Sequence, residues 1–329
     1  MDAVRQIADA VLYEGYILWP YRRSALKNQR RWGFGGVYPR GVDGERSVMR
    51  VECLLEGGDA TPVEVTVRFL QVVERGVERA TPSGREPVSE LTVGGERHLT
   101  WDEAVEREIA LPPVETGGGR GLIVPIAIAA GSQEELLRAA DGSVAGAIVR
   151  RWERLDGRID CGSERLETGL HRVTVTVSNT ASSDGAPRER VLARTFCSAH
   201  AVLHAATGAF VSLADPPERL RAAALACRNE GAWPVPVGAP GDRRTMLASP
   251  IILEDHPRIA PESPGDLFDG GEIDQLLVLN ILSLTDEEKA EMRASDPRAR
   301  EILERTERLS PDELMRLHGA IREFTEVRR

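Results

Sequence analysis

The stretch SVMRVECLLEGGDATPVEVTVRF (residues 47–69) alternates apolar and polar side chains with a period of two residues. This period is typical of β-strands that bury one face, because successive side chains of a strand point to opposite sides. The apolar positions are Met49, Val51, Cys53 and Leu55 in the first half and Val63, Val65, Val67 and Phe69 in the second. Both halves are therefore predicted to be strands, and Gly57-Gly58-Asp59 between them predicts a hairpin turn.

Further strand candidates continue this pattern as far as Leu213, joined by turns that are rich in glycine or small polar residues. They cover residues 106–111, 121–129, 150–159, 171–179, 191–203 and 209–213. Strands joined by short turns, without a helix after each one, favour an antiparallel β-sandwich over a parallel sheet. One helix is predicted inside this region at Ser132–Ala140, because Ser132 can cap it and Glu135 follows at the capping-box position.

Both ends of the chain are predicted to be helical. Residues 4–12 repeat apolar side chains at helical spacing, and capping patterns near the C-terminus begin at Asp269, Thr285, Asp296 and Ser310. The expected fold class is α+β: a mainly antiparallel β-sandwich core with an N-terminal helix and a C-terminal group of short helices. The expected domains are residues 1–46 (N-terminal helix and basic aromatic segment), 47–213 (antiparallel β-sandwich) and 214–329 (proline-rich loop and C-terminal helices packed on the sandwich).

Composition predicts a cytoplasmic protein that does not enter a membrane. The sequence has no apolar run of about eighteen residues, and its first ten residues, which include Asp2, Arg5 and Asp9, do not resemble a signal peptide. Its four cysteines are far apart and form no Cys-x-x-Cys pair, which fits a reduced compartment. The formal net charge of -10 disfavours nucleic-acid binding by the whole molecule.

The basic aromatic segment (residues 16–39) concentrates arginines and aromatic rings in a protein with only 5% aromatic residues. Arginine pairs with acidic groups and stacks on rings, so the segment is predicted to bind an acidic or phosphate-bearing partner. The predicted partner-binding residues here are Trp19, Tyr21, Arg22, Arg23, Lys27, Asn28, Arg31 and Trp32. The alternative is structural, with the rings anchoring the segment and the cations pairing with the protein's own acidic C-terminal part.

A proline-rich acidic loop (residues 254–269) follows a predicted strand at Ile251–Leu253. Its prolines restrict the backbone, so the loop loses little entropy on binding. Glu254, Asp255, His256 and Asp266 are predicted to bind a partner, whereas Glu262 and Asp269 are further carboxylates that could converge with His256 on a cation. A purely structural role in capping turns and helices is the third interpretation.

No catalytic residue, metal ligand or cofactor is assigned. The Cys197-x2-His200-x3-His204 spacing would suit a metal on a helix, but the segment is predicted to be a strand, where Cys197 faces away from both histidines. No Gly-x-Ser-x-Gly, His-Glu-x-x-His or dinucleotide fingerprint occurs in the sequence.

Three segments together resemble a known family. They are VLYEGYILWPYRRSALKNQRRWGFGGVYP (residues 11–39), SPIILEDHPRIAPESPGDLFDGGEIDQLL (249–277) and ILSLTDEEKAEMRASDPRAREILERTERLSPDELMRLHG (281–319). The chain is similar to an uncharacterised family of proteins encoded beside high-affinity nickel-iron (NiFe) hydrogenases in soil bacteria. The resemblance implies a non-catalytic cytoplasmic accessory or assembly protein that docks on a protein partner, such as a NiFe hydrogenase subunit or maturation factor. The alternative function is a metal-dependent hydrolase or processing enzyme that uses Glu254, Asp255 and His256.

Overall fold

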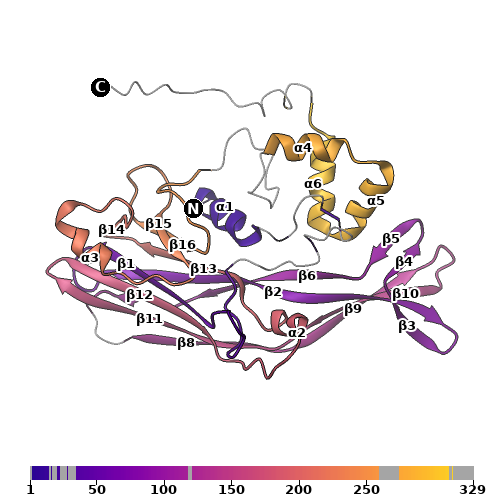
Figure 1. Cartoon of the computed structure of the whole chain (residues 1–329), viewed down its shortest axis with the longest axis horizontal. Helices are drawn as coiled ribbons and strands as arrows, with labels where there is room; N and C mark the ends of the chain where they lie inside the picture. Colours follow the sequence, from indigo (N-terminus) through magenta and orange to yellow (C-terminus); the bar gives the residue numbers. More distant parts are fainter. Residues whose placement is uncertain are drawn as a thin grey trace. The chain divides into compact units, whose positions relative to one another are not determined.

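The computed structural model describes residues 2–14, 16, 21, 22, 28, 35–117, 121–258, 274–310 and 313. The chain forms two compact units (Figure 1). The first contains Met1–Glu14 and Trp32–Arg258, and the second contains Gly15–Arg31 and Ile259–Arg329.

The first unit is a β-sandwich of two large sheets within the described residues, and every strand pairing between its named strands is antiparallel. The five-stranded sheet has the order β14 (Ala209–Val211), β1 (Val48–Glu56), β12 (Leu170–Asn179), β11 (Leu155–Glu167), β8 (Leu122–Ile128). The nine-stranded sheet has the order β15 (Trp233–Pro236), β16 (Thr245–Ser249), β13 (Cys197–Ala205), β2 (Pro62–Thr81), β10 (Val144–Trp152), β9 (Gly131–Arg138). Strands β3 (Gly84–Val88), β6 (Trp101–Ala110) and β7 (Val114–Glu115) pair with β2, and β4 (Glu90–Val93) pairs with β5 (Glu96–Leu99).

The main core lies between the inner faces of these two sheets. It contains the apolar positions that the period of two identifies in β1 and β2, from Met49 to Leu55 and from Val63 to Phe69. Valines of β12 and small residues of β13 complete it, and the rings of Phe69 and Phe196 lie 4.8 Å apart. The predicted α+β class and the antiparallel sandwich are confirmed.

The predicted hairpin between β1 and β2 is wrong. Strand β1 pairs with β12, with Val51 opposite Val175, whereas β2 pairs with β13, with Val67 opposite Ala201. The connection Gly57-Gly58-Asp59 therefore crosses from one sheet to the other. An alternating pattern specifies which face of a strand is buried, but it does not specify the strand beside it.

The predicted helix at Ser132–Ala140 is also wrong, because this segment is strand β9, which pairs with β10. Its acidic side chains reach basic residues that are distant in sequence. Glu134 pairs with Arg85 at 2.6 Å, and Glu135 pairs with Arg150 at 3.0 Å. Tertiary pairing here overrides the helical preference of glutamate and leucine.

The nine-stranded sheet continues beyond Leu213, where the prediction ended the sandwich. Strands β15 and β16 extend it, with Ala248 of β16 opposite Ala201 of β13. The strand predicted at residues 191–203 begins only at Cys197, after the short helix α2 (Arg188–Leu192). The strand predicted at Ile251–Leu253 lies outside β16, which ends at Ser249.

Helices cover the outer faces of both sheets. The predicted N-terminal helix is confirmed as α1 (Asp2–Tyr13), whose residues Ile7, Ala8 and Val11 pack against Val235 and Leu247 of the nine-stranded sheet. A short helical turn (Glu218–Leu220) and α3 (Arg221–Leu225) place Leu220 and Ala224 against the five-stranded sheet.

The second unit contains the described helices α4 (Asp274–Leu282), α5 (Asp286–Ser295) and α6 (Pro297–Glu307). Thr285 and Glu288 form the predicted capping box of α5, and Asp296 caps α6 by accepting from the backbone N–H of Arg298. Ser310 and Glu313 also exchange the predicted capping hydrogen bonds. The cap predicted at Asp269 lies outside the described residues.

Of the helices in the described part of the chain, none is long and apolar enough to cross a membrane.

Candidate docking site

The segment of residues 251–258 follows β16 and holds the described part of the acidic loop. Three contacts fix its course. The Ser249 hydroxyl donates to the Ile251 carbonyl at 2.6 Å, Leu253 packs against the α1 cluster, and the His256 backbone N–H donates to the Pro236 carbonyl at 2.8 Å. The segment is therefore held against β15 and α1 although it belongs to no strand or helix.

Two neighbours of the partly buried Leu253 point toward solvent. The Ile252 side chain is 75% exposed, and Glu254 is exposed as well. A partner that covers the Ile252 side chain would gain the burial of its apolar surface. The segment thus presents an apolar side chain and a carboxylate from a fixed backbone.

Asp255 and His256 lie half-buried in the same segment. The Oδ1 atom of Asp255 and the Nδ1 atom of His256 are each shielded from water and have no hydrogen-bond partner. His256 also adopts a left-handed backbone conformation, with φ of 54°. Unsatisfied buried polar atoms are uncommon in folded proteins, so these two side chains are candidates for a contact with another molecule.

Within the described residues, no group of three or more histidine, cysteine, aspartate or glutamate side chains is arranged to hold a metal ion. The other loop carboxylates, Glu262, Asp266 and Asp269, lie outside the described residues.

Three described residues of the basic aromatic segment, Tyr21, Arg22 and Asn28, belong to the second unit. Tyr21 is fully buried, and the Asn28 side chain, which is also buried, donates to the Arg22 carbonyl at 3.1 Å. The Arg22 guanidinium lies 3.0 Å from the Glu288 carboxylate. The hydrogen bonds from Thr285, together with Arg22, hold the pKa of Glu288 below its usual value. These contacts follow the structural alternative, whereas Trp19, Arg23, Lys27, Arg31 and Trp32 lie outside the described residues.

The Cys197, His200 and His204 series lies on β13, as predicted for a strand. A β-bulge between Cys197 and His200 shifts the register there. The Nδ1–H of His200 donates to the Ser198 carbonyl at 3.1 Å, and burial lowers the pKa of His200 to about 4. His204 bonds instead to the Thr245 hydroxyl at 3.0 Å.

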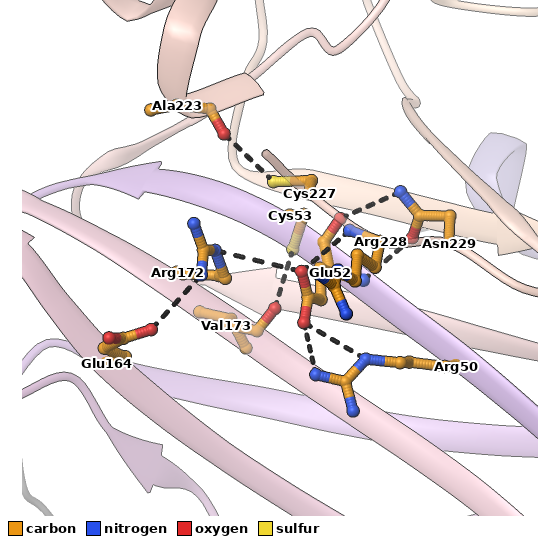
Figure 2. Close-up of polar contacts among 10 residues, drawn as sticks. All are labelled: Arg50, Glu52, Cys53, Glu164, Arg172, Val173, Ala223, Cys227, Arg228 and Asn229. Atoms are coloured by element: carbon orange, nitrogen blue, oxygen red, sulfur yellow. Dashed lines mark hydrogen bonds and ion pairs between the residues drawn. The ribbon is translucent and has the colours of Figure 1, made fainter. Parts of the chain in front are cut away.

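One buried polar cluster surrounds Glu52, which the sequence pattern gave no reason to single out. Figure 2 shows the Glu52 carboxylate between Arg50 and Arg172. The same carboxylate accepts a hydrogen bond from the backbone N–H of Arg228. The Arg228 N–H donates at 2.7 Å, and only 4% of the Glu52 side chain is exposed. Asn229 adds two bonds to the Glu52 backbone, at 2.8 Å and 3.3 Å.

The Glu52 cluster joins β1 and β12 to the segment that follows α3. Burial favours the neutral form of Glu52, but the hydrogen bonds from Arg228 and Arg50 outweigh it and lower the pKa of Glu52. Burial raises the pKa of the Cys227 thiol beside this cluster, and its Sγ lies 3.6 Å from the Ala223 carbonyl (Figure 2). Because its hydrogen bonds are made within the protein, we interpret the cluster as structural.

Comparison with protein-family models and with curated proteins finds no match for this chain.

Proposed function

We propose that this chain is a non-catalytic cytoplasmic accessory or assembly protein that acts by docking on a protein partner associated with a NiFe hydrogenase. The hydrogenase association rests on the resemblance of the three quoted segments. The docking role rests on the geometry of residues 251–258.

The observation that carries the docking role is the exposure of Ile252 on a fixed backbone. Leu253 and the His256 N–H anchor the segment on either side of Glu254, so the segment loses little conformational entropy when a partner binds. An exposed apolar side chain beside a carboxylate matches a partner surface with an apolar pocket and a basic rim. This pairing supports a protein partner over a small substrate.

The test is affinity capture of tagged protein in the native host, followed by quantification of the hydrogenase subunits and maturation factors. The double variant Ile252→Asp/Glu254→Arg should capture at least about tenfold less partner than the wild type. This corresponds to a loss of about 1.4 kcal/mol in binding free energy. Leu225→Asp is the matched control, because Leu225 is 81% exposed on α3, outside the segment, and should capture normally. Equal capture by the double variant and the wild type would remove residues 251–258 from the docking surface, and absence of hydrogenase proteins would remove the association.

The alternative is a metal-dependent hydrolase or processing enzyme that uses Glu254, Asp255 and His256. The specific observation in its favour is the pair of buried atoms without hydrogen bonds, Asp255 Oδ1 and His256 Nδ1. Carboxylate and imidazole are ligands for zinc and nickel. Calorimetric titration with Zn²⁺ and Ni²⁺ should then show a site that Asp255→Asn/His256→Gln removes, whereas identical titrations of the two proteins would exclude this function.

A further inference from the structure

His200 of β13 lies beneath helix α1. Two residues before it, the Ser198 hydroxyl donates to the Val11 carbonyl of α1 at 3.0 Å. Two residues after it, Val202 packs against the apolar cluster that α1 forms with the nine-stranded sheet (Figure 1). The His200 ring between these two contacts is fully buried. Departure of α1 from the sheet would therefore open the ring to water.

One buried arginine connects α1 to the sheet beside His200. Arg68 of β2 is directly opposite His200 in the strand pairing, and only 4% of its side chain is exposed. The Arg68 guanidinium pairs with the Asp9 carboxylate of α1 and lies 3.3 Å from the Glu106 carboxylate of β6. Glu106 also accepts a hydrogen bond from the Tyr13 hydroxyl of α1 at 2.6 Å. Polar contacts thus hold α1 on the same strands that carry His200 and Arg68.

The covered His200 ring does not accommodate a second proton. Its Nδ1–H donates to the Ser198 carbonyl at 3.1 Å, and its Nε2 atom is shielded from water without a hydrogen-bond partner among the described residues. A proton on Nε2 would leave a buried donor unpaired and place a positive ring beside the Arg68 guanidinium. Burial and, to a lesser extent, this guanidinium lower the pKa of His200 to about 4.

The surrounding carboxylates do not compensate for this cost. Glu108 of β6 lies 3.4 Å from Arg68 and 3.8 Å from Arg5 of α1, and it completes the charged groups near the ring. The side chains of Asp9, Glu106 and Glu108 are 40–46% exposed, so water screens their attraction to a protonated ring. Arg68, in contrast, is buried. The neutral ring is therefore the form that fits beneath α1.

Proton uptake and the position of α1 are coupled through this ring. Once α1 has left the sheet, water surrounds His200 and its pKa returns toward the ordinary value of 6.5. Protons then bind more tightly to the open form than to the covered form, so acid favours the open form. The stabilisation of the covered form is fully present above about pH 6.5 and is lost as the pH falls toward 4.

We propose that α1 is a proton-released latch, which stays on the nine-stranded sheet while His200 is neutral and opens when His200 takes up a proton. Opening exposes the apolar side chains that α1 covers, Val202, Val235 and Leu247. It also removes a packing partner of Leu253, which belongs to the same cluster. The proposal is independent of the proposed function, because the latch consists of α1, β2, β6 and β13 alone.

Hydrogen-deuterium exchange of the full chain tests the latch. The measured quantity is the protection factor of the α1 amides, which corrects for the pH dependence of the intrinsic exchange rate. In the wild type it should fall by about eightfold between pH 7 and pH 5.5, and by about sixtyfold between pH 7 and pH 4.5. The amides of residues 173–177 in the core strand β12 should keep their protection, because the latch opens without unfolding the sandwich.

His200→Asn should remove this contribution to the pH dependence, because asparagine does not titrate and its amide can still donate to the Ser198 carbonyl. His204→Asn is the matched control. His204 lies farther along β13, is half-buried and bonds to the Thr245 hydroxyl, so its replacement should leave the pH dependence of α1 unchanged. Titration of the carboxylates around Arg68 is common to the three proteins and cancels in the comparison.

A reciprocal measurement covers the case in which His200→Asn disturbs folding. Coupling works in both directions, so weakening α1 must change the titration of His200. Ile7→Asp/Val11→Asp places two carboxylates in the apolar contact of α1 and should move the pKa of His200, followed by NMR, from about 4 toward 6.5. Leu225→Asp, an exposed leucine of α3, should leave the titration as in the wild type.

Three results would overturn the proposal. The first is an equal loss of α1 protection with falling pH in the wild type and in His200→Asn. The second is a parallel loss of protection in α1 and in residues 173–177, which would assign the effect to global unfolding. The third is a His200 signal that still titrates near pH 4 in Ile7→Asp/Val11→Asp.

Discussion

Replacing His200 by asparagine should remove one contribution to the acid sensitivity of this protein's stability. The His200 ring is fully buried, and burial lowers its pKa from 6.5 to about 4. In the unfolded chain the ring binds a proton at the ordinary pKa, so between these values the unfolded state binds more protons than the folded state. The free energy of unfolding therefore rises with pH in this window. The contribution of His200 is fully present above about pH 6.5 and is lost as the pH falls toward 4.

The magnitude follows from the two pKa values. For one group with these values, the linkage relation gives a loss of about 1.2 kcal/mol at pH 5.5 and about 2.4 kcal/mol at pH 4.5, relative to pH 7. Asparagine does not titrate, and its amide can donate to the Ser198 carbonyl as Nδ1 of His200 does. The difference between wild type and His200→Asn should therefore depend on pH by these amounts.

The assay is urea unfolding of both proteins from pH 4.5 to 7.5 at constant ionic strength. Other titrating groups are common to the two proteins, so they cancel in the difference. NMR of the histidine Cε1–H signals provides an independent check, in which the signal lost in the variant should be the one that titrates below pH 5. A difference that is constant across the pH range, or a His200 signal that titrates near pH 6.5 in the folded protein, would refute the reasoning.

Three further predictions concern single contacts. Glu52→Gln should lower the free energy of unfolding by about 2 kcal/mol at pH 7, because it removes a hydrogen-bonded carboxylate from its arginines. The free energies of unfolding of the two proteins should converge as the pH falls below 4.5, because the lowered pKa of Glu52 then ceases to stabilise the fold. Thr285→Ala should cost about 1 kcal/mol, visible as a lower thermal midpoint of the helical signal, and Thr285→Ser should restore it. Gly146→Ala should cost more than about 2 kcal/mol in urea unfolding, since its Cβ would lie 2.2 Å from the Glu78 carbonyl oxygen. Gly58→Ala, with open space around it and no left-handed backbone, should cost less.

The acidic loop was identified from sequence, but the way it presents its side chains was not. Its composition singles out Glu254, Asp255 and His256 as polar residues between prolines. The exposure of Ile252 follows from two contacts made by its neighbours, the packing of Leu253 near α1 and the bond from His256 to Pro236. Helix α1 is distant from Leu253 in the sequence, and strand β16 separates Pro236 from His256. No local sequence pattern therefore predicts these two contacts.

The docking prediction for the basic aromatic segment stays a prediction. Of its residues, Tyr21 is buried and Arg22 pairs with Glu288 of α5, whereas Trp19, Arg23, Lys27, Arg31 and Trp32 lie outside the described residues. A cation is attracted equally to an acidic partner and to an acidic residue of its own chain. Sequence cannot separate these two cases, because the distance between Arg22 and Glu288 exists only in the folded second unit.

The sequence by itself determined what depends on neighbouring residues. The period of two assigned the buried faces of β1 and β2, and the capping box at Thr285 and Glu288 formed as predicted, because in each case the interacting groups lie within a few residues of one another. Only the tertiary structure decided which strands pair. Strands β1 and β2 lie in different sheets, and β9 is a strand because its backbone bonds to β10, and Glu134 and Glu135 then reach Arg85 and Arg150. Which strands pair depends on the burial and hydrogen bonding of residues far apart in the chain. These contributions to the free energy belong to the whole fold, so a local sequence pattern does not contain them.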